Sequence, residues 1–574
     1  MRSRGKESVA VGGKRPINYE VPLVALASLA FAISFGQSII GHLSTEGLSG
    51  DWDHFLQLRW VPVYTLTHFH QFPFWNPYRC GGMPLFAHPQ STLLTPLTLL
   101  DLVFGPVVAV HVQIIAAIAI AFGGAYFLGR VLGMSKTGAV GCAIGFAGSS
   151  WFYLHAFAGH VNFCAYTFAP WAFACLYLSS ERERLSYAVL GAVVMALTIT
   201  GGGTYASPQI GFVLALLAAL IALQKRSFFP FFALAVIALF SIGLAAAKIV
   251  PSLQFVGLYA RPIKPDESSP LSLLFRALFD HQQNPLPAPP GQGWDFYEFG
   301  AYIGIVLAGL ALLAIVFRPR RALPWVTIGV ALVALAAGNF GRYSPWVLQH
   351  QLPVLASHRV PSRWLVLLTM VIGVLAGIGI DIIKSRFRFL GTLIAISLLA
   401  IVFVDDWQVS TFYLPHIFDK PQAASPVSAT FHQTSGKGHR MLVAARANTG
   451  VIRCYDPLRI KHYAIGSDRP DYRGEQYLLD GGNVTLEQWT PNALSFEVDT
   501  DLPTEMVVNQ NFDPNWRLAK GKGEVFSNDG LIAVRLPAGR QRIELAYHSL
   551  GFVIGLAISM LSLVAMFLVW RHEL

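Results

Sequence analysis

Residues 364–404 read WLVLLTMVIGVLAGIGIDIIKSRFRFLGTLIAISLLAIVFV, which is two apolar runs joined by the basic segment KSRFR. Each run comes close to the roughly 20 apolar residues that a helix needs to cross the hydrocarbon core of a membrane. Basic residues between two such runs are typical of a short cytoplasmic turn. The stretch therefore predicts a membrane-spanning hairpin with helices at 364–383 and 389–404.

The composition extends this prediction to the whole chain. The 574 residues are 54% hydrophobic and only 13% charged, whereas about a quarter of the residues of a soluble domain are charged. We therefore expect a mostly α-helical, polytopic membrane protein in contact with the lipid bilayer. The apolar runs place about twelve transmembrane helices at 21–41, 107–129, 138–155, 163–179, 186–201, 209–223, 228–248, 301–317, 323–338, 364–383, 389–404 and 549–570.

Basic residues indicate the topology, because they cluster before the first predicted helix and after every second one. The clusters are Arg2, Arg4, Lys6, Lys14 and Arg15, then Arg130 and Lys136, Arg182 and Arg184, Lys225 and Arg226, Arg318, Arg320 and Arg321, Lys384, Arg386 and Arg388, and Arg571. Since such residues stay on the cytoplasmic side, both termini are expected in the cytoplasm. The same clusters explain the formal net charge of +10, so we expect no nucleic-acid partner.

This topology divides the chain into a transmembrane domain (1–404) with external loops at 42–106, 249–300 and 339–363, an extracytoplasmic β-rich domain (405–548), and a final helix with a cytoplasmic tail (549–574). Within the β-rich domain, ALSFEVDT, TEMVVNQN, LIAVRLPAG and RQRIELAYH alternate apolar and polar residues between Gly, Asn, Asp and Pro, which predicts a small antiparallel β-domain. Its earlier half predicts no particular element. In the first loop, STLLTPLTLLDLVFG is too short to span comfortably and predicts a re-entrant or interfacial helix.

The five cysteines include no CxxC pair and no Cys/His cluster at metal spacing. This pattern argues against both a structural zinc site and a disulfide framework. Cys142, Cys164 and Cys175 lie in apolar runs and are interpreted as small buried side chains.

The stretch GDWDHFLQLRW, residues 50–60, places Asp51 and Asp53 directly after the first predicted helix. Such carboxylates could deprotonate a hydroxyl, hold Mg²⁺ or Mn²⁺, or be solvated loop charges. The following FPFWNPYRCGGMPLFAHPQ is rich in Pro, Gly and aromatic residues, which indicates a fixed loop rather than a tether. Both acids are candidate catalytic residues and, together, the candidate metal ligands. His54 and Arg59 beside them are candidate substrate-binding residues, whereas His68, His70 and His88 are interpreted as ordinary loop histidines.

Four further charged residues at the outer ends of helices are candidate substrate-binding residues. Arg359 and Arg363 in SHRVPSRW could grip a phosphate with their planar guanidinium groups, or snorkel to lipid headgroups, or pair with a carboxylate. Lys248 in AAAKIVPSLQF either faces a cavity or partner or snorkels. Glu298 in WDFYEFGAYIG could complement Asp51, bind an acceptor, or favour the start of the next helix through its dipole.

GDWDHF, FPFWNPYRCGGMPLFAHPQ, SHRVPSRWLVLL with LAGIGID, and NQNFDPNWR with VRLPAGRQRIELAYH occur in this order along the chain. Together they resemble the YfhO family of bacterial multi-spanning membrane proteins, which is grouped with the type-C (GT-C) glycosyltransferases. The resemblance implies a GT-C-like fold in the bacterial cytoplasmic membrane. It also implies transfer of a sugar from a polyprenyl-phosphate donor to an extracytoplasmic envelope glycan, polymer or lipid acceptor. The family's leading acid falls on Asp51, as base or acceptor-orienting group, and Asp53 departs from the commonest pattern.

Two other functions remain open at this point. A transporter or flippase of a lipid-linked saccharide would also need many helices and a polar cavity, although the chain shows no internal repeat. Alternatively, the β-domain could bind carbohydrate or a partner, with the membrane part as its scaffold. The sequence contains no Walker motif and no dinucleotide-binding fingerprint.

Overall fold

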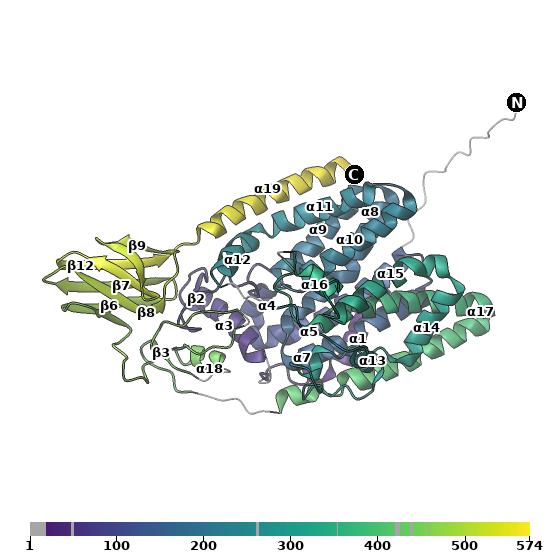
Figure 1. Cartoon of the computed structure of the whole chain (residues 1–574), viewed down its shortest axis with the longest axis horizontal. Helices are drawn as coiled ribbons and strands as arrows, with labels where there is room; N and C mark the ends of the chain where they lie inside the picture. Colours follow the sequence, from purple (N-terminus) through teal and green to yellow (C-terminus); the bar gives the residue numbers. More distant parts are fainter. Residues whose placement is uncertain are drawn as a thin grey trace.

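The computed structural model describes residues 19–47, 51–259, 263–352, 354–419, 425–436, 440–456 and 458–573. Its helices form one body, and a β-rich lobe lies at one end of it (Figure 1). The N-terminal basic cluster, Arg2, Arg4, Lys6, Lys14 and Arg15, and Gly50 of the acidic motif lie outside the described residues.

Helices account for most of the described chain. In order they are α1 (Glu20–Phe35), α2 (Gln37–Ile40), α3 (Trp52–His68), α4 (Leu97–Phe104), α5 (Pro106–Val131), α6 (Lys136–Ala147), α7 (Ser150–Ala158), η1 (Val161–Phe168), α8 (Ala169–Arg182), α9 (Leu185–Thr200), α10 (Ala206–Lys225), α11 (Phe229–Leu244), α12 (Ala246–Leu258), α13 (Leu271–Phe279), η2 (Phe296–Glu298), α14 (Gly304–Phe317), α15 (Pro319–Ala336), α16 (Pro345–Gln349), η3 (Pro361–Trp364), α17 (Leu365–Thr411), η4 (Leu414–Phe418), α18 (Met441–Arg446) and α19 (Leu550–Glu573).

A multi-pass membrane protein is confirmed, but about twelve spans are not. Among the described residues, six helices are long and apolar enough to cross a membrane. A seventh span is possible if α11 and α12, which meet at a 77° bend, are counted as one. The apolar helices α1, α9 and α14 have 16, 16 and 14 residues, fewer than the roughly 20 that a perpendicular crossing needs.

Three predicted helices are interrupted. The expected helix at 21–41 is divided into α1 and α2 at Gly36. The expected helix at 138–155 is divided into α6 and α7, because the chain breaks at Gly148 and Ser149 caps α7 by accepting a hydrogen bond from Trp151 N. A Cβ placed on Gly148 would lie 2.9 Å from a carboxylate oxygen of Asp406, so the break occurs where a neighbouring helix approaches closely. The expected helix at 228–248 ends at Leu244, where the chain turns into α12.

The hairpin predicted from 364–404 lies within α17. A Cβ placed on Gly391 would collide with the carbonyl oxygen of Ile383, although eight residues of straight helix rise by about 12 Å. The chain therefore reverses inside this element, and its two arms, Pro361–Phe387 and Phe389–Phe418, are both candidate spans. The helix continues to Thr411, past residue 404, where the membrane part is expected to end.

The β-rich region is confirmed as two four-stranded antiparallel sheets with strand orders β10-β11-β8-β5 and β6-β7-β12-β9. Its strands are β5 (Gln476–Leu478), β6 (Asn483–Thr490), β7 (Ala493–Thr500), β8 (Thr504–Asn511), β9 (Trp516–Lys520), β10 (Glu524–Asn528), β11 (Leu531–Leu536) and β12 (Gly539–Tyr547). The stretches ALSFEVDT and TEMVVNQN are β7 and β8. Their alternating apolar side chains enter one core, which also contains Trp75 from the first loop.

The first loop and the segment before the β-domain are joined covalently. Cys80 and Cys454 form a disulfide across 374 residues of sequence, so the expectation of no disulfide is wrong. Spacing could not reveal this pair, because cysteine connectivity is set by the fold and not by local sequence. Short pairs β1 (Trp75–Asn76) with β2 (Met83–Pro84), and β3 (His432–Thr434) with β4 (Thr449–Val451), organise the two segments.

Candidate active site

The candidate site forms where the end of α7 meets the start of α3. Gly159 ends α7 in the left-handed conformation, and a Cβ there would collide with the backbone nitrogen of Trp52. The close approach lets the Asp51 N–H donate a 2.7 Å hydrogen bond to the carbonyl of Ala158. It also places His160 Nε2 3.1 Å from Asp51 Oδ2. A glycine with positive φ is therefore what brings a histidine to the acid.

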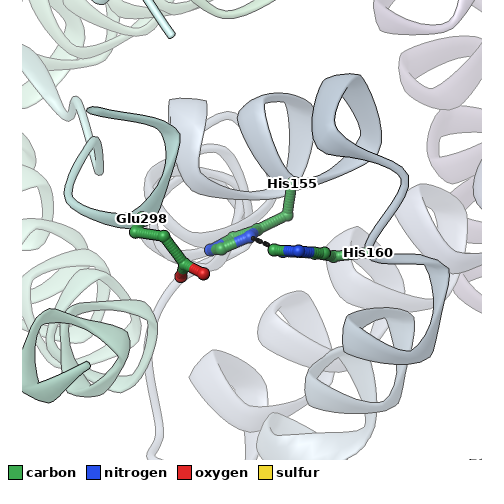
Figure 2. Close-up of side chains that lie close together, drawn as sticks. All are labelled: His155, His160 and Glu298. Carbon is green, nitrogen blue, oxygen red and sulfur yellow. Dashed lines mark hydrogen bonds between the residues drawn. The ribbon is translucent and has the colours of Figure 1, made fainter. Parts of the chain in front are cut away.

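His160 is connected to a second histidine. The Nδ1 atoms of His155 and His160 are 2.8 Å apart, so one ring donates and the other accepts (Figure 2). Glu298 of η2 extends its carboxylate toward the His155 ring. His155, His160 and Glu298 are all buried, and each offers one ligand atom within 4.8 Å of the others. Asp51, His160, His155 and Glu298 thus form one continuous polar cluster.

Glu298 is held by Arg363. Arg363 Nε donates a 2.8 Å hydrogen bond to Glu298 Oε2, and its Nη2 donates to Oε1. The guanidinium also lies over the rings of Phe163 and Tyr205, at 4.9 and 4.5 Å from their centroids. Burial raises the pKa of Glu298, but the charge and hydrogen bonds of Arg363 lower it below its usual 4.5. Of the sequence interpretations of Arg363, the structure shows pairing with a carboxylate.

Asp51 is the most accessible acid of the cluster. Its side chain is 18% exposed, against 9% for His160 and 2% for Glu298. Burial raises the pKa of Asp51, but the hydrogen bond and charge of His160, the charge of His54 and a hydrogen bond from Tyr455 lower it below its usual 3.8. The carboxylate is therefore ionised at neutral pH and is a weak base. Such a carboxylate can orient a hydroxyl before the reaction and accept its proton once the new bond is forming.

Asp53 and Arg59 are engaged elsewhere. The Asp53 carboxylate accepts hydrogen bonds of 2.8 and 3.0 Å from the backbone nitrogens of Met441 and Leu442, at the start of α18. Arg59 forms a buried 2.7 Å ion pair with Asp101 that ties α3 to α4. The two acids, separated by one residue, thus have different partners.

His54, Lys248 and Arg359 also have defined surroundings. His54 is buried between Gln90 and Arg79. Lys248 Nζ donates to the backbone carbonyls of Phe86 and His88, at 2.8 and 2.6 Å, so it holds the first loop. Arg359 lies over Trp294 at 4.5 Å, and its Nε has no hydrogen-bond partner among the described residues. Its charge acts on Glu298 and on Tyr455, which places it beside the cluster.

The cluster also has features of a metal site. His155 Nε2 is buried and has no hydrogen-bond partner in the described part of the chain. A buried nitrogen without a partner is expected where a side chain binds a metal ion. Two imidazole nitrogens and one carboxylate oxygen suit Zn²⁺ better than the Mg²⁺ or Mn²⁺ expected from paired acids. Arg363 neutralises Glu298, so a cation here would depend on Asp51 for its charge balance.

Sequence reasoning missed His155, His160 and Tyr455. The available signal was AFAGHVNF, in which a glycine and a histidine end an apolar helix on the same predicted side as Asp51. Tyr455 carried no local signal, because it reaches Asp51 only through the disulfide-linked segment.

No family model matches the chain, and no curated protein matches it in sequence. Arabinofuranosyltransferase AftD from Mycobacteria is similar with a TM-score of 0.43 and 17% identity, over 70% of this chain and 27% of that chain. The Archaeoglobus fulgidus oligosaccharyltransferase in the apo form is similar with a TM-score of 0.42 and 13% identity, over 76% of this chain and 65% of that chain. The archaeal oligosaccharyltransferase AglB from Archaeoglobus fulgidus, in complex with an inhibitory peptide and a dolichol-phosphate, is similar with a TM-score of 0.39 and 13% identity, over 69% of this chain and 56% of that chain.

This chain thus spans about a quarter of AftD and less than two thirds of the archaeal enzyme. All of these TM-scores are below 0.5, so the assignment of function depends on the residues of the site. Membership of the YfhO family stays a prediction.

Proposed function

We propose that this chain is a GT-C-type membrane glycosyltransferase, and that Asp51 orients the acceptor hydroxyl. The observation that carries the proposal is the partly exposed, ionised Asp51 carboxylate, held by His160 and Tyr455 at the meeting point of three segments. Perturbed, partly accessible acids of this kind are typical of catalytic sites. The donor is a polyprenyl-phosphate-linked sugar, and the acceptor is an envelope glycan, polymer or lipid. The proposed location is the bacterial cytoplasmic membrane.

In the proposed reaction, the acceptor oxygen forms a bond to the anomeric carbon as the bond from that carbon to the lipid phosphate breaks. Asp51 accepts a hydrogen bond from the acceptor hydroxyl and aligns it for attack. The hydroxyl proton moves to the Asp51 carboxylate as the new bond forms and leaves this partly exposed group to water, while His160 Nε2 donates a hydrogen bond that holds the carboxylate in place. The electron pair of the broken bond leaves with the phosphate, so no nucleotide is required.

Arg359, rather than Arg363, is the proposed phosphate ligand. Two donors of Arg363, Nε and Nη2, already bind Glu298. Arg359 Nε, in contrast, has no hydrogen bond to the described residues. We expect Arg359→Ala to raise the KM for the lipid donor at least tenfold, and Arg359→Lys to restore part of it, because ammonium lacks the planar fork. Arg342→Ala, which removes an arginine over Tyr343, is the matched control. Equal donor KM values in the Arg359→Ala and control proteins would exclude the assignment.

The Cys80–Cys454 disulfide supports an extracytoplasmic location for the site, because structural disulfides form in oxidising compartments. Reporter fusions near Asp480 are expected to report an external location, and fusions near Arg184 and Arg320 a cytoplasmic one. A cytoplasmic signal near Asp480 would contradict both the topology and the placement of the active site.

The proposal includes a metal ion bound by His155, His160 and Glu298. We expect Zn²⁺ to bind the purified protein in an equilibrium dialysis assay, and His155→Ala to weaken that affinity by about 10- to 100-fold, since it removes a ligand. His68→Ala is the control, because His68 stacks on Tyr64 and not on the cluster. Undetectable Zn²⁺ binding by the wild-type protein would exclude a zinc site.

A transporter or flippase of a lipid-linked saccharide is the second candidate, and one observation favours it. Asp406 in the second arm of α17 is fully buried at the break between α6 and α7, and neither of its oxygens has a hydrogen-bond partner within the described ranges. Buried acids in spanning helices are often part of ion or proton pathways. Movement of a labelled lipid-linked sugar across proteoliposomes without transfer, and its loss in Asp406→Asn, would place transport first.

A further inference from the structure

Three consecutive residues before the β-domain, Cys454, Tyr455 and Asp456, are attached to the first loop; we call them the 454–456 clip. Cys454 is bonded to Cys80. The Asp456 carboxylate accepts hydrogen bonds of 3.1 and 3.0 Å from Arg79 Nε and Nη2. Arg79 Nη2 also donates to the Tyr455 carbonyl at 2.7 Å. Two neighbouring residues of the first loop thus hold all three residues of the clip.

The attachment is deeply buried, which makes it rigid. The side chains of Arg79 and Asp456 are 0% and 3% exposed. His88 Nε2 lies 3.3 Å from the same Asp456 oxygen, and burial lowers the pKa of His88, so this imidazole is expected to be neutral near pH 7. A buried ion pair with its hydrogen bonds satisfied holds one geometry, because breaking it would leave an uncompensated charge.

The clip is also connected to the helix that carries Asp51. Arg79 Nη1 donates a 3.2 Å hydrogen bond to Gln57, and Arg79 Nη2 contacts His54 Nδ1. His54 and Gln57 belong to α3, whose first turn follows Asp51. The clip and the acid are therefore positioned by the same helix, although they are about 400 residues apart in the sequence.

We propose that Tyr455 is a positioning residue of the active site, and that the 454–456 clip exists to hold its hydroxyl against Asp51. This inference rests on the proposed function, because it assigns how Asp51 is kept oriented toward an acceptor. The Tyr455 ring lies 5.9 Å, between centroids, from the ring of His54 on α3, and its hydroxyl is hydrogen-bonded to Asp51. Anchoring on both sides of Tyr455 keeps the hydroxyl in place before substrate binds, which is how preorganised sites maintain catalytic geometry. The C-terminal half of the chain thereby completes a site that begins in the first loop.

Tyr455→Phe removes the hydroxyl and leaves the ring and the clip intact. We expect kcat to fall about tenfold or more and the donor KM to stay unchanged. The groups that act on Asp51 besides Tyr455 are His160 after α7, His54 on α3 and Tyr297 on η2, and all three are retained. Tyr463→Phe, at a residue of the same segment that is 40% exposed, is the control. A Tyr455→Phe protein with the wild-type kcat would overturn the inference.

A second measurement needs no sugar transfer, so it separates this inference from the proposed function. A double-mutant cycle on the free energy of unfolding provides it, with Tyr455→Phe and Asp51→Asn made singly and together. We expect the two losses to be non-additive, because both substitutions remove one contact, and the losses of Tyr463→Phe and Asp51→Asn to add. Additive losses in the first cycle would overturn the inference even if transfer is confirmed. A non-additive first cycle without any transfer would retain the contact and reject the glycosyltransferase.

The disulfide provides a third comparison. Cys80→Ser with Cys454→Ser is expected to lower kcat with the donor KM unchanged, as Tyr455→Phe does. Adding Tyr455→Phe should then have little further effect, because both changes act through one contact and are not additive. Additive losses would show that the disulfide acts on stability and not through Tyr455.

Discussion

Asp51→Asn is expected to reduce sugar transfer by about a hundred- to ten-thousand-fold, the usual contribution of a group that accepts a proton during the reaction. Asparagine keeps the size of the side chain but loses the negative charge that faces His160 and the acceptor hydroxyl. The measurement is transfer from a polyprenyl-phosphate sugar in proteoliposomes, with thermal unfolding recorded on the same protein. Transfer at the wild-type rate would remove Asp51 from the reaction and would place the transporter function first.

The matched control is Asp53→Ala, two residues further along. Its carboxylate caps α18, so we expect transfer close to the wild-type rate and a free energy of unfolding lower by about 1 kcal/mol. Equal losses of transfer in the two variants would indicate that the loop, and not Asp51, had been disturbed.

The depressed pKa of Asp51 also predicts how stability depends on pH. A carboxyl with a folded-state pKa below its usual 3.8 stabilises the folded protein above that value, and the contribution is lost as the pH falls toward the folded-state pKa. The free energy of unfolding of the wild-type protein should therefore fall more steeply below pH 3.8 than that of Asp51→Asn. Parallel pH dependences would show that the acid gains no stabilisation from His160 and its neighbours.

Arg363→Ala is expected to lower the free energy of unfolding by about 3–5 kcal/mol, because it leaves the buried Glu298 carboxylate without its counter-charge. The sequence interpretation of Arg363 as a phosphate ligand predicts another pattern, normal abundance with weak use of the donor. Chemical unfolding in detergent micelles, together with the abundance of the folded protein, distinguishes the two.

A double variant tests the cause of that loss. Arg363→Ala with Glu298→Gln removes both charges, so it should recover much of the stability lost in Arg363→Ala alone. If the second substitution adds to the loss instead, the ion pair is not the reason for the destabilisation.

The sequence by itself determined those helices and strands whose formation depends on residues close together in the chain. Apolar runs near 20 residues long identify spanning helices because unpaired backbone groups are excluded from lipid, so both arms of α17 follow from residues 364–404. Alternation over eight residues identifies β7 and β8 for an equally local reason, since successive side chains of a strand face opposite sides. The position of Asp51 directly after the first apolar run likewise marks it as a candidate from the sequence alone.

About twelve spans are not confirmed, because apolar runs do not reveal breaks and bends. Gly148 and the turn after Leu244 interrupt two runs that appear continuous in composition. The close approach of Asp406 accompanies the first break, and that contact comes from a helix more than 250 residues away.

Only the tertiary structure decided the composition of the site. His160 reaches Asp51 because Gly159 permits two helix ends to touch, and Tyr455 reaches it because Cys454 and Asp456 are fixed to Cys80 and Arg79. No periodicity or motif spacing in the sequence reveals these contacts. Each contact joins segments that are far apart in the sequence and are brought together by packing. The same packing gave Asp53 a structural partner in α18 and left Asp51 partly exposed, so two acids that look equivalent in the sequence have different chemistry in the fold.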